Sequence, residues 1–168
     1  MRLRGLPVLA ALLAWLAGCG GVRLEEGSYV VRGKGYRVGA PVGWTQIESD
    51  ADLTLRRTEL QAGLMAHATC EGKPPTRPLP VLVRHLRFGL RDVRDLVEAP
   101  VTLGGLPGTA HRFRATLDGV PVAVRAVTLR GPACVYDLVG VAPLEGIAAL
   151  APDFERFSTG FALGGAAW

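Results

Sequence analysis

The chain has few lysines and no cluster of basic residues. Of its 19 Lys and Arg residues, only Lys34 and Lys73 are lysines, and no basic run is longer than Arg56-Arg57. A predominance of arginine arises as easily from codon composition as from recognition of phosphate or carboxylate groups. Proteins that bind nucleic acids typically gather basic residues on one segment or face, so the sequence predicts no nucleic-acid partner.

Motifs of common enzyme and metal sites are also missing. No serine lies in a Gly-x-Ser-x-Gly turn, and the glycine-rich segment around Lys34 lacks the spacing of a phosphate-binding loop. The histidines are His67, His85 and His111, and only His67-x-x-Cys70 has a metal-like spacing, with two ligands where zinc takes four. We therefore expect no catalytic residue, no cofactor and no metal, and we interpret the histidines as structural.

Long hydrophobic runs are scarce. The N-terminal apolar run extends only from Gly5 to Ala17, whereas a helix needs about 20 apolar residues to cross a bilayer. Arg2 and Arg4 precede this run, and positive charges followed by a short apolar segment are typical of a secretory signal peptide. We therefore expect a signal peptide at residues 1–18 and no permanent membrane-spanning helix.

The apolar run ends in Leu16-Ala17-Gly18-Cys19, which resembles the lipobox of bacterial lipoproteins. The alternatives are a buried helix and an ordinary secretory signal that happens to end in cysteine. The resemblance implies cleavage before Cys19 and acylation of its thiol, and two or three acyl chains would hold the protein on a membrane almost permanently. Gly20 stands where an aspartate typically retains such proteins at the inner membrane, so we expect an outer-membrane protein that faces the periplasm.

Cleavage would remove 18 of the 168 residues and leave 150, a size suited to one domain. We expect the acylated cysteine and a short tether at residues 19–27, followed by a single domain at 28–168. Because Arg2 and Arg4 leave with the signal peptide, 17 basic residues would face 15 acidic ones, a net charge of +2. The mature domain is therefore less basic than the full chain.

Cysteine is scarce, with three residues in the chain. Assigning Cys19 to lipid leaves Cys70 and Cys134, and an even pair in an oxidising compartment favours a disulfide. A redox-active pair would usually be Cys-x-x-Cys with a lowered thiol pKa, whereas these two close a loop of about 64 residues. We predict a structural disulfide and keep redox catalysis as the alternative.

Short strands are predicted in the first half of the domain and helices at two later places. Apolar and polar residues alternate with the period of a strand that has one buried face in the segments 29–31, 36–38, 44–48, 52–58 and 63–70. Large apolar residues recur every three or four positions in 79–93 and 147–161, which predicts amphipathic helices. Pro80 suits the first turn of the former, and Pro152 suggests that the latter starts near it.

Asp118-Gly119 predicts a two-residue hairpin turn. The register that places Leu117 opposite Val120 gathers the apolar side chains of both strands on one face. It also places Arg112 opposite Arg125, with Arg114 beside them on the other face.

Like charges directly opposed across strands are unfavourable, so a carboxylate, an anionic ligand or solvent must separate Arg112 from Arg125. One possibility is a structural ion pair at the sheet surface, for which Asp137 in the next strand is a candidate; this face would then have no ligand-binding role. The alternative is an anion-binding patch formed by Arg112, Arg114 and Arg125.

The order of elements predicts an α+β fold with a central antiparallel β-sheet flanked by helices. The segments YRVGAPVGW, PLPVLVRHLRFGL, LDGVPV, CVYDLVGVAP and DFERFSTGF together resemble small bacterial envelope lipoproteins of the PsbP-like, DcrB-like α/β/α sandwich class. This resemblance covers most of the chain after the signal peptide.

Members of the class resemble PsbP, an extrinsic photosystem subunit, and a Ran-binding protein of the same fold, both of which act by binding another protein. The resemblance implies a membrane-tethered, non-catalytic envelope lipoprotein that serves as a protein-interaction or accessory module for an unidentified envelope protein. Fold alone does not carry function, and no motif here matches either partner surface. The alternative is a lipoprotein that binds a small anionic or amphipathic ligand at Arg112, Arg114 and Arg125.

Overall fold

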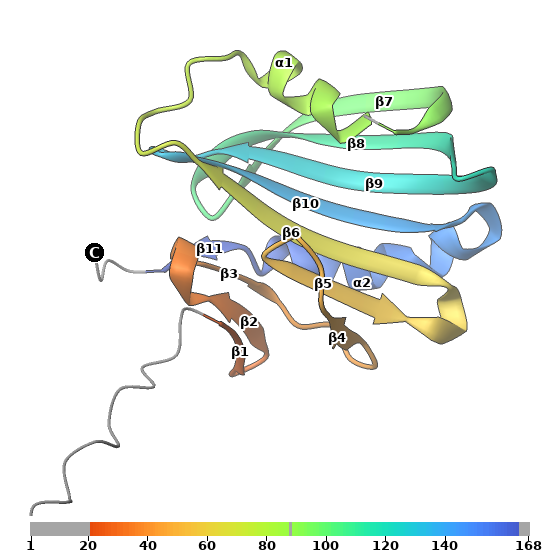
Figure 1. The fold of residues 1–168 in the computed structure, drawn as a ribbon, viewed down its shortest axis with the longest axis horizontal. Coiled ribbons are helices and arrows are strands. Elements are labelled where there is room, and N and C mark those ends of the chain that lie inside the picture. Colours follow the sequence, from red (N-terminus) through yellow and green to blue (C-terminus); the bar gives the residue numbers. More distant parts are fainter. Residues whose placement is uncertain (1–20, 88, 165–168) are drawn as a thin grey trace, which may run out of the picture.

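A computed structural model describes residues 21–87 and 89–164 of the chain. The predicted signal peptide, the lipobox and Cys19 therefore lie outside the described residues. Within these residues, two antiparallel sheets and two α-helices form the fold (Figure 1).

The larger sheet has seven antiparallel strands. In spatial order these are β4 (Thr45–Ile47), β5 (Leu53–Arg57), β6 (Ala62–Cys70), β10 (Cys134–Pro143), β9 (Val120–Arg130), β8 (Leu106–Leu117) and β7 (Arg91–Leu103). The predicted hairpin is confirmed, because Leu117 lies opposite Val120 across β8 and β9. Asp118 and Gly119 both have positive φ, as the predicted turn requires.

The smaller sheet consists, in order, of β1 (Val22–Glu25), β2 (Ser28–Val31), β3 (Tyr36–Gly39) and β11 (Ala162–Leu163). Strand β1 falls within the predicted tether, residues 19–27, and pairs along its whole length with β2. Glu26 and Gly27 adopt positive φ and make the tight turn that joins the two strands. Both ends of the described chain therefore belong to this sheet, where β1 and β11 are the two edge strands.

Helix α2 (Ile147–Thr159) packs on β10 and β3 and so joins the two sheets. Leu150, Phe154 and Phe157 are buried, which confirms the predicted apolar stripe. The helix begins at Ile147 and not near Pro152, which lies inside it. Pro152 and Ala148 are both exposed, so water can bond the Ala148 carbonyl that lacks a proline N–H partner.

Helix α1 (Leu79–Arg84) is shorter than predicted. It ends in the 3-10 turn η3 (His85–Arg87), and the chain then turns at Gly89, with φ of +83°, into edge strand β7. The three- and four-residue spacing of apolar side chains wrongly predicted one helix over 79–93. Leu86 and Leu90 fit that spacing because both pack against the cluster around Phe113, although they do not share a helix. Residues 91–93 belong to a strand.

The predicted α/β/α sandwich fits only in part. Helix α2 lies against one face of the seven-stranded sheet, whereas α1 covers only β8 and β9 on the other face (Figure 1). A helix of six residues cannot cover a sheet of seven strands. The fold is therefore mostly antiparallel β-structure, with a large part of one sheet face uncovered by helix.

Cys70 and Cys134 are directly opposite each other on the central strands β6 and β10. Their Cα atoms lie 4.1 Å apart, and the disulfide between them is formed. The predicted pairing is therefore confirmed. The bond lies at the end of β6, where the chain leaves the sheet for a proline-rich segment.

Candidate functional site

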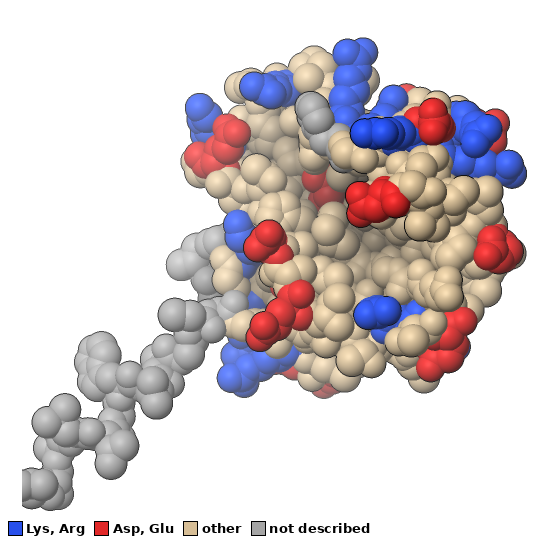
Figure 2. Space-filling model, turned by 45° about the vertical axis from the view of Figure 1, so that its right-hand side comes forward, with Lys and Arg blue, Asp and Glu red and all other residues tan. Residues whose placement is uncertain are grey.

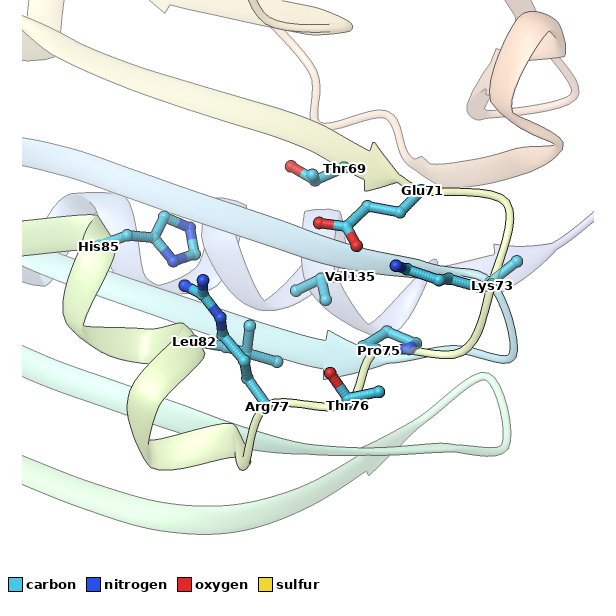
Figure 3. A pocket seen from close by; sticks show the side chains of 10 residues that line it. Thr69, Glu71, Lys73, Pro75, Thr76, Arg77, Leu82, His85 and Val135 are labelled. Atoms are coloured by element: carbon cyan, nitrogen blue, oxygen red, sulfur yellow. The ribbon is translucent and has the colours of Figure 1, made fainter.

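A cavity of about 460 Å³ lies between the proline-rich segment that follows β6 and the central strands of the large sheet. Figure 3 shows Glu71, Lys73, Arg77 and His85 around this space, with the guanidinium of Arg77 directed toward His85. Val135 and Leu82 supply apolar parts of the lining. Binding sites for small molecules typically measure about 300–1,000 Å³, so the cavity has the size of a ligand site.

Prolines shape the wall of this cavity. Residues 71–78 contain Pro74, Pro75 and Pro78, whose rings fix φ and favour an extended backbone. Pro78 immediately precedes α1 and accepts hydrogen bonds from the first turn of that helix through its carbonyl. The segment thus leads the chain from the end of β6 to α1 across the open face of the sheet.

Asp137 carries a buried carboxylate on the same face of the sheet. It is 3 % exposed, and its two oxygens have different partners. His85 Nε2 lies 2.8 Å from Oδ2, and the Thr128 hydroxyl donates a 2.7 Å hydrogen bond to Oδ1. These contacts supply the partners that a desolvated carboxylate requires. Because His85 lines the cavity, the pair connects the cavity to the centre of the sheet.

The pKa of His85 is raised above its usual value, chiefly by the hydrogen bond with Asp137. Partial burial acts in the opposite direction and is outweighed; the Asp137 charge and the Leu82 backbone add to the increase. The environment therefore favours the protonated imidazolium. In that form, His85 would present a positive charge to the cavity that it lines.

A second histidine lies deeper in the same sheet face. The side chain of His111 is 1 % exposed, and its Nδ1 is 3.5 Å from Glu98 Oε1, which also pairs with Arg87 at 2.6 Å. Burial lowers the pKa of His111 and outweighs the opposing effect of Glu98. The two histidines are therefore shifted in opposite directions, His111 toward its neutral form and His85 toward its protonated form.

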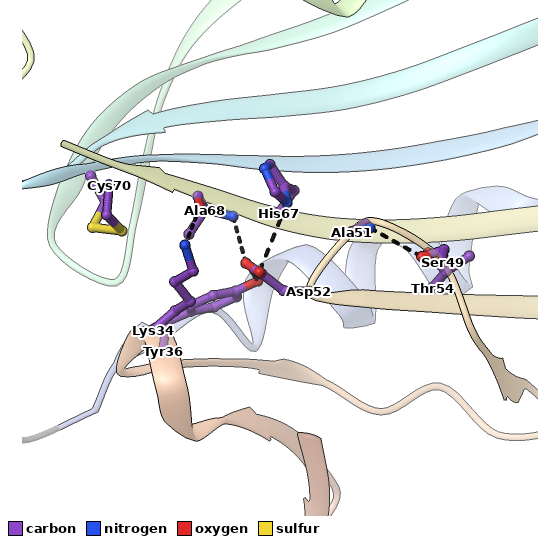
Figure 4. A network of polar contacts seen from close by, with 10 residues as sticks. Lys34, Tyr36, Ser49, Ala51, Asp52, Thr54, His67, Ala68 and Cys70 are labelled. Atoms are coloured by element: carbon purple, nitrogen blue, oxygen red, sulfur yellow. Dashed lines mark hydrogen bonds and ion pairs between the residues drawn. A yellow bond between two sulfur atoms is a disulfide. The ribbon is translucent and has the colours of Figure 1, made fainter. Parts of the chain in front are cut away.

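Asp52 links the small sheet to the large one at the end that holds the disulfide (Figure 4). Its Oδ2 accepts hydrogen bonds from Tyr36 Oη at 3.0 Å and from the Ala68 amide at 2.7 Å. Lys34 Nζ donates to the Ala68 carbonyl at 3.1 Å, and His67 Nδ1 lies 3.8 Å from Asp52 Oδ1. Lys34 and His67 thus take part in a structural junction, as the interpretation of their segments as turn and strand implied.

The predicted arginine patch divides into two parts. Arg112 does lie opposite Arg125, but Arg114 Nε forms an ion pair with Asp95 Oδ2 at 3.3 Å. Asp137 is not their counter-ion, because its register opposite Thr128 directs its side chain to the face that carries α1. The ion pair considered for Asp137 is therefore wrong. Arg112 and Arg125 instead line a small groove beside α2.

Neither a metal-ligand cluster nor a membrane-crossing helix is found in the described part of the chain. Among residues 21–87 and 89–164, no three His, Cys, Asp or Glu side chains come together in a way that could hold a metal ion. No helix in those ranges combines the length and apolarity that spanning a bilayer needs.

The sequence could not predict the cavity or the contacts of Asp137 with His85 and Thr128. Asp137 stands in the otherwise apolar segment CVYDLVGVAP, and a lone acidic residue in a buried strand is a signal of a partnered charge. Its partners come from α1 and β9, so only the tertiary arrangement identifies them.

No protein-family profile and no curated protein matches this chain by sequence. Solved structures do match it. A cyanobacterial PsbP, CyanoP from Synechocystis, superposes with a TM-score of 0.61 over 92 % of this chain and 98 % of its own, at 13 % identity. The chain has a PsbP-like fold.

Two further structures with this fold come from other bacteria. LpqN, which is involved in cell envelope biogenesis of Mycobacterium tuberculosis, gives a TM-score of 0.60 at 14 % identity over 77 % of this chain and 83 % of its own. A protein from Bacteroides thetaiotaomicron gives 0.60 at 10 % identity over 89 % of this chain and 51 % of its own. At such identities the similarity shows the fold alone.

Proposed function

We propose that this protein is a lipid-anchored, non-catalytic accessory protein of the bacterial cell envelope. In this proposal it binds a partner protein with the sheet face that carries the cavity. The observation that carries the proposal is the large part of this face that α1 leaves uncovered, with a ligand-sized cavity beside it. Figure 2 shows a hollow in the molecule with acidic side chains around it and basic side chains gathered above it.

The composition of this face suits recognition of another protein. Glu71, Lys73 and Arg77 offer both signs of charge at the cavity, while Leu82 and Val135 offer apolar contact. Protein interfaces typically combine an apolar centre with a polar rim. The fold shared with CyanoP and with LpqN, the latter involved in cell envelope biogenesis, supports an accessory role in the envelope.

The anchor would come from Cys19, two residues before the described part begins. Acylation there would hold the small sheet next to the membrane, because β1 belongs to that sheet. We place the protein on the outer membrane, facing the periplasm, since Gly20 follows the cysteine.

Crosslinking in intact cells tests the proposed interface. A photoreactive residue at Thr76, in the cavity wall, is compared with one at Thr45, an exposed residue of edge strand β4. We expect Thr76 to capture one envelope protein and Thr45 to capture none of it. Equal capture from both positions, or no protein adduct from Thr76, would contradict the proposal.

A further inference from the structure

A second concave site lies on the face of the large sheet that α2 covers. A groove of about 170 Å³ runs between α2 and the strands β7, β8 and β9. Besides His111 and Ala126, its lining includes four apolar residues and two arginines: Val97, Ala99, Ala110, Phe154, Arg112 and Arg125. The small side chains of Ala99 and Ala110 lie opposite each other across β7 and β8, which leaves room between Val97 and Phe154.

The two arginines in this groove lack a counter-ion among residues 21–87 and 89–164. Arg112 and Arg125 are directly opposed across β8 and β9, an arrangement that like charges disfavour. Arg125 Nε is buried, and no hydrogen-bond acceptor in that part of the chain reaches it. A buried donor without an acceptor costs free energy, so an acceptor from outside would relieve both the repulsion and this unmet hydrogen bond.

Arg114 provides an internal comparison. It lies two residues from Arg112 on the same strand, but Asp95 pairs with it at 3.3 Å. The neighbouring edge strand thus supplies a carboxylate to Arg114, whereas the residue of β7 opposite Arg112 is the apolar Val97. Of these three arginines of β8 and β9, Arg114 alone has a carboxylate partner in the described residues.

We propose that this groove binds a small carboxylate that carries a short apolar group. Guanidinium groups hold carboxylates through paired, charge-assisted hydrogen bonds, and Val97, Ala99, Ala110 and Phe154 offer apolar contact to the attached group. The volume of about 170 Å³ is below the roughly 300–1,000 Å³ of sites for larger ligands, so the groove takes only a short group. This site is separate from the proposed protein interface, because α2 and α1 lie against opposite faces of the sheet.

Binding of 3-phenylpropionate to the full chain in zwitterionic nanodiscs tests the proposal. Equilibrium dialysis against empty nanodiscs corrects for uptake by lipid. We expect saturable binding of one 3-phenylpropionate per protein. Acetate, which lacks the apolar group, and 3-phenylpropanol, which lacks the charge, are both expected to bind at least about tenfold more weakly. Acetate loses the apolar contacts, and 3-phenylpropanol loses the charge-assisted hydrogen bonds with the arginines.

Matched variants locate the site. Arg112→Ala and Arg125→Ala are each expected to weaken binding about tenfold or more, the usual effect of losing a hydrogen bond to a charged group. Arg114→Ala makes the same change of charge on the same face and is expected to change affinity less than about twofold. Thermal unfolding checks that each variant is folded, and Arg125→Gln provides a polar substitute if the alanine variant unfolds.

Three results would overturn the proposal: no saturable binding, equal affinity for 3-phenylpropanol, or an Arg114→Ala variant that loses as much affinity as Arg112→Ala. None of them bears on crosslinking from Thr76, so the two proposals fail independently.

Discussion

Asp137 shows how a single buried charge organises one face of this fold. It is 3 % exposed and lies between apolar neighbours on a central strand. Its oxygens are satisfied by Thr128 on the adjacent strand and by His85 just after α1. The contact with His85 attaches the end of a short helix to the middle of the sheet. Removal of either partner would leave one oxygen of the desolvated carboxylate without a hydrogen bond.

The His85–Asp137 pair predicts a pH-dependent contribution to stability. Because the pKa of His85 is raised in the folded protein, its contribution is fully present below the unfolded pKa of about 6.5 and is lost as pH rises through the folded value. We expect wild type to exceed His85→Gln in free energy of unfolding most clearly at about pH 6 and less at higher pH. Urea unfolding across this range measures the difference.

Asp137→Asn serves as the control for this effect. It keeps the shape of the side chain but removes the carboxylate whose hydrogen bond and charge raise the pKa of His85. The difference in free energy of unfolding between wild type and Asp137→Asn should therefore also shrink as the pH rises. A difference between wild type and His85→Gln that stayed constant across the range would argue against the pair as its source.

At the scale of elements, the end of α2 and strand β3 approach each other closely because both carry glycine. A Cβ at Gly39 would meet the Arg156 carbonyl oxygen, and one at Gly160 would meet the Gly39 backbone. Neither glycine has positive φ, so close packing and not turn geometry excludes a side chain there. This contact joins the small sheet to the helix that covers the large one.

Gly39→Ala tests this contact. The added methyl would push β3 away from the backbone at the end of α2. We expect the free energy of unfolding to fall by about 2 kcal/mol, in the range of other overpacked sites. Gly63→Ala is the matched control, because its Cβ would meet nothing closer than the Leu55 carbonyl at 3.9 Å. Denaturant unfolding of both variants gives the comparison, and equal effects would exclude the close approach as the cause.

The disulfide joins two central strands whose cysteines are 64 residues apart. The chain-entropy treatment of a loop of this length gives an upper value of about 4 kcal/mol. We expect the Cys70→Ser, Cys134→Ser double variant to lose about 2–4 kcal/mol of unfolding free energy. Reduction of the wild type should produce a similar loss and leave the double variant unchanged. Free thiols at both positions in exported protein, measured by non-reducing mass spectrometry, would show that the bond is not formed in the cell.

At the scale of the whole molecule, the two sides of the large sheet differ in character. One side carries α1, the cavity and the buried Asp137, and the other carries α2 and the groove of Arg112 and Arg125. Both ends of the described chain lie in the small sheet, as its two edge strands β1 and β11 (Figure 1). An anchor next to β1 would leave both concave sites on the part of the molecule beyond that sheet.

The proposed anchor predicts that Cys19 alone carries lipid. Metabolic labelling with an alkyne fatty acid is expected to tag the wild type and the Cys70→Ser, Cys134→Ser double variant equally. Cys19→Ala should lose the tag, because the acyl-bearing thiol is gone, and it should remain uncleaved by the lipoprotein-specific peptidase. Undiminished labelling of Cys19→Ala would refute the anchor.

Local pattern alone determined several features of this protein. The period-two segments became strands, the Asp118-Gly119 turn set the register of β8 with β9, and the scarcity of cysteine paired Cys70 with Cys134. These features depend on residues close in sequence or on simple counting. For that reason they could be predicted without knowledge of the fold.

Only the tertiary structure decided which groups meet across the sheet. The register of β10 with β9, with Asp137 opposite Thr128, directs Asp137 toward His85 and away from Arg112, and β7 brings Asp95 to Arg114. The tertiary structure also has α1 ending at Arg84, with Leu86 packed against the cluster around Phe113 from a 3-10 turn. Strand order and facing depend on pairings between distant segments, where a shift of one residue reverses every side chain, and local periodicity carries no information about such shifts.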